Sequence, residues 1–322
     1  KNQNSKKFPP FTKNQASSVA TEMYLQTLMD FIPIHVVLAS IIVLFISYVS
    51  IRKYLKSMST SLDKKSTPKR QIPKVILWTA PRCVSTAFER AIIEIPNGKI
   101  FHEPFSIPYY FGEQRVSTRY ANEDSNGSTY ESTATELTKP YEDDENIDFV
   151  FSKDMAYYIT QYKPHYYYSY LLSTILRSNS SSNSSFHHTF LIRRPDKVVA
   201  SLYKASIDTE LTGWDSFDPK EIGFDDLYLI YQRCLQLGYD NLVIIDADDL
   251  LKDPKKILKL YCDNVGLKYS DSITTWKPGQ VEAFKLWDGW HDAVINSSGF
   301  KLRTKEEVER KEKKLKLYQD NV

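Results

Sequence analysis

Two segments of this sequence carry side chains that could hold a negatively charged group. The first, Thr79–Thr86 (Thr-Ala-Pro-Arg-Cys-Val-Ser-Thr), joins a short apolar run at Val75–Trp78 to a helical pattern. Backbone N–H groups converge at the start of a helix and attract anions. Arg82 adds a forked cation, and Ser85 and Thr86 add hydroxyl donors. The segment therefore predicts a phosphate site, with an ordinary strand–turn–helix and a surface arginine as the alternative.

The same loop excludes one common kind of phosphate site. A Walker loop needs two glycines and a lysine before its serine or threonine, and Thr79–Thr86 contains neither glycine nor lysine. The sequence therefore disfavours a nucleotide kinase. We expect Ser85 or Thr86 to cap the following helix, because Glu89 lies at capping-box distance from Thr86.

The second segment places an arginine and a serine eight residues apart. Arg193 ends a predicted strand that begins at His188, Pro195 begins a helix, and Ser201 lies within that helix. Together, Arg193 and Ser201 could bind a second phosphate. Arg194 is an alternative for Arg193, and a solvent-exposed or salt-bridged arginine pair is the plainer interpretation.

Polar side chains also follow two other predicted strands. His102 and Glu103 come after a strand at Gly98–Phe101, and Lys153 comes after a strand at Asp148–Ser152. Ligands of parallel α/β sheets bind at the carboxyl ends of the strands, so we expect these groups to share one site with the two segments above. His102 or Glu103 could act as a general base, although a purely structural role is open for each.

Strands alternate with helices along most of the chain. This order predicts an α/β fold with three layers and a mostly parallel, doubly wound sheet. The clearest strand is Asn241–Asp246, and the clearest helices are Phe224–Leu237 and one that begins at Pro254 and ends at Gly266. Residues 112–147 are polar, and we interpret them as a mobile insertion or lid.

The two segments together resemble the nucleotide-binding motifs of sulfotransferases, which have a P-loop NTPase-like fold. In that family a Pro-Arg-Ser-x-Ser-Thr loop follows the first strand, and an arginine and a serine with the separation of Arg193 and Ser201 bind a 3′-phosphate. A weaker match is Trp287–Phe300, where many members have a Gly- and Trp-containing loop that closes over the nucleotide. The matches span residues 74–301, and the sequence departs from the family at Cys83, where serine is usual.

The resemblance implies a sulfotransferase that uses 3′-phosphoadenylyl sulfate (PAPS) as donor, releases 3′,5′-ADP (PAP) and requires no metal. A sulfuryl group would pass in line to an acceptor hydroxyl, with the developing charge stabilised as in phosphoryl transfer. Lys153 would contact the sulfuryl group, and His102 or Glu103 would be the base, with His102 slightly preferred. The implied donor-binding residues are Arg82, Cys83, Val84, Ser85, Thr86, Arg193, Ser201, Trp290 and His291.

The acceptor and even the catalytic competence stay open at this point. Cys83 motivates the alternative of a pseudoenzyme that binds the nucleotide or a partner protein without transfer. The acceptor could be a hydroxylated lipid, a sterol, a sugar or a small metabolite. The tyrosines between Tyr157 and Tyr170 could wall its pocket, or they could alternate between core and surface.

The sequence also predicts a single-pass membrane anchor. Residues 31–51 carry no Asp, Glu, Lys or Arg and are long enough to cross a bilayer. They separate a polar, flexible segment at 1–30 from a basic stalk at 52–73, and the catalytic domain is expected at 74–322. We expect a protein of the Golgi or ER membrane, because sulfotransferases with this layout are commonly found there.

The side of the membrane stays open. The basic stalk favours a cytosolic catalytic domain, whereas Asn-x-Ser sequons favour a glycoprotein that faces the lumen. The sequons are at Asn126, Asn179, Asn183 and Asn296.

Composition narrows the remaining function classes. A net charge of +2 gives no reason to expect nucleic-acid binding, and a hydrophobic content of 42% suits a sizeable core. The three cysteines, Cys83, Cys234 and Cys262, have no metal-binding spacing. They argue against a disulfide framework and against a zinc site.

Overall fold

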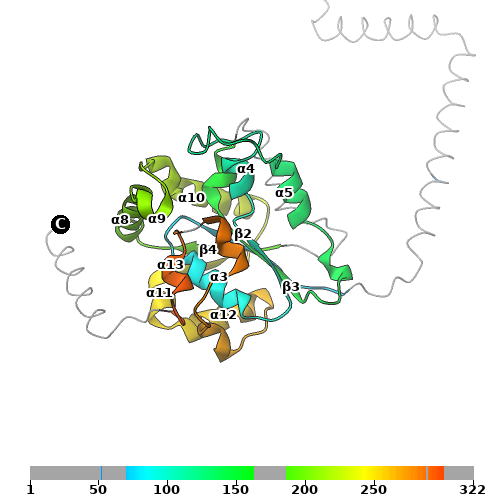
Figure 1. Ribbon diagram of the computed structural model, residues 1–322. Helices are drawn as coiled ribbons and strands as arrows, with labels where there is room; N and C mark the ends of the chain where they lie inside the picture. The colour runs from blue at the N-terminus through cyan, green and yellow to red at the C-terminus, as the bar shows by residue number, and fades with distance from the viewer. Residues whose placement is uncertain (1–51, 53–69, 163–185, 288, 301–322) are drawn as a thin grey trace, which may run out of the picture. The chain divides into compact units, whose positions relative to one another are not determined.

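The computed structural model of the protein describes residue 52 and residues 70–162, 186–287 and 289–300 (Figure 1). The chain divides into two compact units, Lys1–Pro68 and Lys69–Val322, and the fold below is that of the second unit. The predicted flexible segment at 1–30, the predicted anchor at 31–51 and most of the predicted stalk at 52–73 lie outside the described residues. In the described part of the chain, no helix is both long enough and apolar enough to span a bilayer.

Among the described residues, five strands form one sheet in the order β2-β3-β1-β4-β5, and every neighbouring pair is parallel. The central strand β1 is buried at all six positions, as expected of a strand that is covered on both faces. The predicted α/β fold with a parallel sheet is therefore confirmed. The strands are β1 Lys74–Thr79, β2 Gly98–His102, β3 Phe149–Met155, β4 Phe186–Ile192 and β5 Val243–Asp246.

Helices connect the strands and cover the sheet. The predicted helix starts at Pro195 and Pro254 are confirmed, and the left-handed Gly266 (φ 75°) ends the second of these helices. The α-helices are α3 Ser85–Ile93, α4 Ser106–Tyr110, α5 Tyr130–Leu137, α6 Ala156–Thr160, α8 Pro195–Ser206, α9 Thr209–Thr212, α10 Phe224–Gln236, α11 Ala247–Lys252, α12 Pro254–Val265 and α13 Asp292–Ile295. The 3₁₀ helices are η1 Tyr141–Asp143, η2 Pro219–Ile222, η3 Asp271–Thr274 and η4 Glu282–Trp287.

Two hydrophobic clusters fill the two faces of the sheet. Along β1 the side chains alternate, so Ile76 and Trp78 belong to one cluster while Val75 and Leu77 belong to the other. Helices α4, α5, α6 and α10 contribute to the first cluster, and α3, α11 and α12 contribute to the second. Figure 1 shows α4, α5 and α10 on one side of the strands and α3 and α12 on the other. The molecule therefore has the predicted three layers.

The connections bring the ends of β1 and β4 together. Within the sheet, β2 and β3 lie on one side of β1, and β4 and β5 lie on its other side. Thr79 of β1 pairs with Leu191 of β4, so the residues that follow these two strands leave the sheet side by side. Ligands of open α/β sheets bind at such a switch point, outside the carboxyl ends of the strands.

The predicted insertion at 112–147 packs into the core in part. It contains α5, whose Tyr130, Ala134 and Leu137 are buried in the cluster that covers Trp78. Polar composition suggested a mobile lid, but the apolar residues of α5 recur every three or four positions and form a buried stripe. At least this part of the segment therefore belongs to the framework of the domain.

Candidate functional site

The loop between β1 and α3 has a strained backbone. Arg82 (φ 61°) and Val84 (φ 70°) are both left-handed, which costs a residue other than glycine roughly 1–3 kcal/mol. Val84 precedes the first helical residue, and no side chain caps α3. The predicted cap at Ser85 or Thr86 is therefore wrong, because the Thr86 hydroxyl and the Glu89 carboxylate bond to histidines instead. Without a side-chain cap, the first N–H groups of α3 stay available to an anion.

Arg82 meets the second predicted phosphate-binding segment. Its Nε donates to the Ser201 hydroxyl at 3.0 Å, and Arg193 Nη1 donates to the Arg82 carbonyl at 2.7 Å. Burial, and then the charge of Arg193, lower the pKa of Arg82. Among the described residues, no carboxylate forms an ion pair with Arg82, whose other bond goes to the Trp290 carbonyl at 3.2 Å. The edge of the sheet therefore carries positive charge that a bound anion would balance.

The neighbouring Arg194 is directed elsewhere. Its Nε and Nη2 donate to the two carboxylate oxygens of Asp196, both at 3.0 Å, and its side chain is 41% exposed. The sequence left open which arginine of the pair would bind a phosphate. The geometry favours Arg193, because only Arg193 reaches the loop after β1.

Cys83 turns its side chain away from the loop's open side. It is fully buried in the cluster formed by Val75, Leu77 and Phe88. Burial raises the pKa of the Cys83 thiol to about 11, although a hydrogen bond with Thr79 lowers it in part. A thiol in this position takes no direct part in binding a ligand. Serine is usual at this position in the family. With cysteine there, residue 83 contributes only its backbone N–H to the loop.

The buried thiols give a direct test of this placement. Cys83, Cys234 and Cys262 are all buried, and burial raises the pKa of each thiol to about 11 or 12. At pH 8 at most about one thiol in a thousand is then a thiolate. We expect a thiol reagent such as DTNB to label none of the three in the native protein and all three after unfolding. Rapid labelling of one cysteine, mapped to Cys83, would show that the loop is open.

Glu103 and Lys153 form the buried floor of the site. Lys153, which lies within β3 and not after it, donates to Glu103 Oε1, and Tyr158 donates to Glu103 Oε2 at 2.8 Å. Burial alone would raise the pKa of Glu103, but Lys153, His102 and His291 together lower it to about 2. Burial lowers the pKa of Lys153, and Glu103 and Glu89 outweigh this and raise it. This pair is therefore a carboxylate and an ammonium at neutral pH.

The backbone of Glu103 is also constrained. Its φ of 45° is left-handed, and its N–H donates to the Lys153 carbonyl at 2.7 Å. This bend follows the end of β2, and the carboxylate that it positions accepts from Lys153 and Tyr158. Strain of this kind persists where the surrounding structure fixes it and is concentrated at functional sites.

The histidines form a chain of hydrogen bonds beside this pair. His102 Nδ1 lies 2.7 Å from Glu89 Oε2, and His102 Nε2 lies 3.0 Å from His291 Nε2. His291 Nδ1 lies 3.1 Å from the Thr86 hydroxyl. Burial, and then the charges of His102 and Lys153, lower the pKa of His291 well below its usual value. Glu89 was not among the predicted site residues, because sequence alone treated it as a capping residue.

Residues 289–295 pack against the loop. The Trp290 carbonyl accepts from Arg82, and the indole lies 5.9 Å from the Arg82 guanidinium. Gly289 (φ 78°) allows this path, because a Cβ there would lie 1.6 Å from the Leu211 carbonyl oxygen. The glycine therefore lets the chain pass close to the helix α9 while presenting Trp290 and His291 to the site.

Replacing Gly289 by alanine should displace this segment. We expect the affinity for PAP, the nucleotide that the resemblance implies, to fall about 10- to 100-fold, since a shift of about 1 Å in a positioned group can have that effect. Gly238→Ala is the matched control, because Gly238 is also left-handed (φ 84°) but has no atom near its missing Cβ. Both variants carry the cost of an alanine at positive φ, so calorimetric titration with PAP isolates the effect of the displacement. Equal affinities would contradict this role of the segment.

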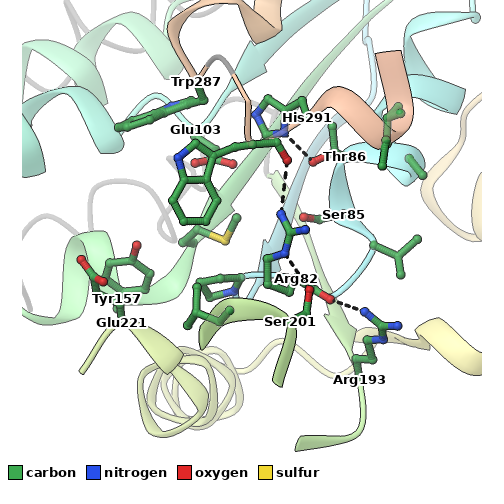
Figure 2. Close-up of a pocket in the computed structure, with 18 of the residues that line it drawn as sticks. Arg82, Ser85, Thr86, Glu103, Tyr157, Arg193, Ser201, Glu221, Trp287 and His291 are labelled. Atoms are coloured by element: carbon green, nitrogen blue, oxygen red, sulfur yellow. Dashed lines mark hydrogen bonds between the residues drawn. The ribbon is translucent and has the colours of Figure 1, made fainter. Parts of the chain in front are cut away.

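One pocket of about 240 Å³ is lined by side chains of the loop after β1 and of the other segments described above (Figure 2). Figure 2 shows Arg82, Ser201 and Arg193 on one side and Tyr157 and Glu221 on the opposite side. Of the predicted site residues, nine line the pocket: Arg82, Val84, Ser85, Thr86, Glu103, Arg193, Ser201, Trp290 and His291. The other three, Cys83, His102 and Lys153, lie behind the lining.

The second side of the pocket was not predicted as a unit. Aromatic rings of Tyr110, Tyr157, Tyr158, Trp214, Trp287 and Trp290 line it. Glu221 is buried there and is held by the Arg119 guanidinium, which lies 3.6 Å from the Trp214 ring. Burial raises the pKa of Glu221, although Arg119 opposes this effect. The tyrosine-rich run had indicated Tyr157 and Tyr158, whereas Arg119 and Glu221 carry no signal in the sequence.

One cluster of described residues has side chains of the types that bind metals. Ligand atoms of His102, Glu103 and His291 lie within 4.8 Å of one another. Lys153 donates to Glu103 Oε1, the oxygen that lies 3.8 Å from His102 Nε2, so its ammonium already occupies the cationic position in this cluster. Its charge would repel a metal ion at close range, and the cluster is better described as a hydrogen-bonded network.

Comparison with known proteins adds to this geometry. The chain matches the family model described as "Sulfotransferase domain" over residues 73–312. Branched-chain-amino-acid aminotransferase-like protein 1 of Arabidopsis thaliana is 28% identical over 235 residues, which are 71% of this chain and 37% of that protein. The related protein 2 is 32% identical over 114 residues, 35% of this chain and 19% of that protein. The chain therefore spans well under half the length of these curated relatives.

Solved structures with a similar chain include two sulfotransferases. A sulfotransferase domain from the curacin biosynthetic pathway shows 14% identity and a TM-score of 0.42, covering 76% of this chain and 98% of that chain. A mouse sulfotransferase complexed with PAP shows 13% identity and a TM-score of 0.34, covering 66% of this chain and 64% of that chain. The family model covers more than half of the 322 residues, including both predicted phosphate-binding segments. The chain thus belongs to the sulfotransferase family.

Proposed function

We propose that this protein transfers the sulfuryl group of PAPS to a hydroxyl group of a small acceptor and releases PAP. The observation that carries the proposal is the meeting of Arg82, Arg193 and Ser201 at the switch point of the sheet. A nucleotide with phosphates at its 5′ and 3′ positions offers two anions to this arginine pair. Arginine forks suit phosphate oxygens, and the uncapped start of α3 supports the same charge.

Each end of the donor has its own group of residues in this proposal. Ser85 and Thr86, with the N–H groups of residues 82–86, would hold the 5′-phosphosulfate beside Arg82. Arg193 and Ser201 would hold the 3′-phosphate. Trp290 would lie over the nucleotide, since its ring already stacks near the Arg82 guanidinium. All the side chains invoked here belong to the pocket lining.

The transfer itself needs a base but no covalent intermediate. The acceptor oxygen would form a bond to sulfur while the bond from sulfur to the bridging phosphate oxygen breaks, and both electrons of that bond leave with PAP. The proton of the acceptor hydroxyl would pass to Glu103. Glu103 is preferred to His102 because only Glu103 lines the pocket. The negative donor would raise the pKa of Glu103 and make it a better proton acceptor than in the free protein.

Lys153 has a different role here from the predicted sulfuryl contact. It is completely buried and holds Glu103 Oε1. We infer that it positions the base and keeps the site electrically balanced while the donor is absent. Charge that develops on the bridging oxygen would then be stabilised chiefly by Arg82 and the loop N–H groups.

The aromatic side of the pocket would take the acceptor. Its polar groups are already bonded to one another: the Tyr110 and Tyr157 hydroxyls lie 2.9 Å apart, Tyr110 contacts Glu221, and Tyr158 binds Glu103. A sugar would lose hydrogen bonds to water and find few free partners here, which is costly. An acceptor with a flat, apolar body and one hydroxyl fits these rings better.

Transfer of radiolabelled sulfate tests this function. The purified protein would be incubated with [³⁵S]PAPS and a panel of phenols, apolar alcohols, sterols and sugars. We expect labelled product and an equal amount of PAP, with flat apolar hydroxyl compounds preferred to sugars. Tight binding of PAP without any turnover would favour the pseudoenzyme instead. A preference for sugars would leave the transferase intact and contradict the proposed acceptor class.

A further inference from the structure

Four side chains connect the proposed phosphate loop to the buried interior. They run from Thr86 on α3 through His291 and His102 back to Glu89, one turn further along the same helix. The three contacts measure 3.1, 3.0 and 2.7 Å. Glu89 is fully buried, and only 3% of the His102 side chain is exposed. Figure 2 shows the pocket end of this chain, where His291 points toward Thr86.

When both imidazoles are neutral, the chemistry of each group fixes the direction of these hydrogen bonds. A carboxylate only accepts, so His102 Nδ1 carries the proton that faces Glu89. Neutral His102 then has an unprotonated Nε2, which must accept from His291 Nε2–H. Neutral His291 is left with an unprotonated Nδ1, which must accept from the Thr86 hydroxyl. Every hydrogen bond therefore points from the pocket toward Glu89.

This direction is unfavourable for anion binding. Thr86 has one hydroxyl proton, and in this arrangement that proton faces His291 rather than the pocket. The Thr86 oxygen then presents lone pairs to a phosphate. A single added proton reverses the arrangement, because a doubly protonated His291 donates to both Thr86 and His102. The Thr86 proton is then free to face the anion.

We propose that Glu89 is a positioning residue, which through His102 and His291 sets the direction in which Thr86 donates, and that binding of the donor phosphate places one proton on His291. The inference rests on the proposed function, since it takes the ligand at Thr86 to be the 5′-phosphate of the nucleotide. It adds a residue behind the pocket, Glu89, and a proton that is taken up with the ligand.

The surroundings of His291 agree with this assignment. The titratable and charged groups that face it are His102 and Glu103 at the end of β2, Lys153 on β3 and Arg82 in the loop after β1. The cations Lys153 and Arg82 oppose a charge on His291, and with burial they keep its pKa well below the usual value. A phosphate dianion at Thr86 would raise this pKa, since an opposite charge favours the charged form. Affinity for the anion is then greater at low pH and is lost as the pH rises through the pKa of the complex.

Proton uptake can be measured directly by calorimetry. PAP would be titrated into the full-length protein at pH 7.5–8.5 in buffers of different ionisation enthalpy. The nucleotide phosphates, with second pKa values near about 6, stay fully ionised in this range. We expect the uptake of up to one proton per PAP and an affinity that falls by up to about tenfold per pH unit.

We call the hydrogen-bonded chain Thr86–His291–His102–Glu89 the relay. Three variants test the relay separately from the stability of the fold. His291→Asn can still donate to Thr86 but cannot be protonated, so its PAP affinity should be independent of pH and its uptake zero. Glu89→Gln keeps the shape, but its amide can donate to His102 Nδ1 and so reverse the hydrogen bonds without an added proton; we expect its proton uptake to fall and the pH dependence of its PAP affinity to weaken. Glu94→Gln, at the C-terminal end of the same helix but paired with Arg90 instead, should behave as wild type.

Each outcome decides a definite question. Binding of PAP by the wild type without proton uptake would overturn the relay and leave the proposed function standing. Unchanged uptake in His291→Asn would do the same. If Glu89→Gln fails to fold, the comparison of His291→Asn with wild type still decides. Absence of PAP binding by the wild type would defeat the proposed function, and the relay with it.

Discussion

Replacing Arg193 by alanine is expected to weaken the binding of PAP about a hundredfold. Arg193 follows β4 and donates to the Arg82 carbonyl at 2.7 Å, so its guanidinium is fixed at the point where the 3′-phosphate is proposed to bind. Removing a charged hydrogen-bond donor from a partly buried site costs about 3 kcal/mol, which corresponds to that factor. Calorimetric titration with PAP gives the affinity directly.

Arg194→Ala is the matched control for this prediction. Arg194 is adjacent in sequence and equal in charge, but it binds Asp196 at the surface. Its loss should change the affinity less than about threefold, because exposed ion pairs contribute little. A comparable loss in both variants would mean that general electrostatic attraction, and not a defined phosphate site, holds the nucleotide. Unchanged affinity in Arg193→Ala would remove Arg193 from the site.

Replacing Glu103 by glutamine is expected to lower kcat about 10²- to 10⁴-fold, the range for loss of a general base. Glutamine keeps the shape of the side chain, so PAP affinity should stay within a few-fold of wild type. Lys153 loses its nearest carboxylate but keeps Glu89 at 3.6 Å, and we expect a lower melting temperature because the buried charge is less well paired. Circular dichroism and PAP titration would establish that the variant is folded before its rate is measured.

His102, the alternative candidate for the base, provides the control for this prediction. If His102 were the base, His102→Gln would lower kcat at saturating donor as much as Glu103→Gln is expected to. We expect His102→Gln to act mainly on PAP affinity, through the relay to Thr86. The pH profile separates the two further. The pKa of Glu103 is about 2 in the free protein, so Glu103 should add no acid limb to kcat/KM between pH 5 and 9. Full activity of Glu103→Gln would exclude it as the base.

The sequence was most informative where local pattern and chemistry coincide. Val75–Trp78 could be predicted as a buried strand and Pro195 as a helix start, because these features depend on neighbours in the chain. Arg193 and Ser201 could be predicted as a pair because their spacing matches a family motif. The sheet order then places them beside Arg82, as the rule for carboxyl-end sites requires.

The rest of the site depends on contacts between distant parts of the chain. Glu89 was expected to cap α3, but His102 lies opposite it and Lys153 lies behind it, so the carboxylate serves them instead. The partners Thr86 and His291 are 205 residues apart, and no local pattern links them. Arg119 and Glu221 are likewise joined only by folding. Such pairs become visible only once the elements are placed in space.

The central claim is that the arginine-lined edge of the sheet binds a nucleotide through two separate phosphates. The most direct measurement compares the binding of PAP, 5′-AMP and ATP·Mg²⁺ to the wild-type protein by calorimetry. We predict that PAP binds at least about a hundredfold more tightly than 5′-AMP, which lacks the 3′-phosphate, and that it needs no metal ion. Equal binding of PAP and 5′-AMP, or tighter binding of ATP·Mg²⁺, would contradict the account.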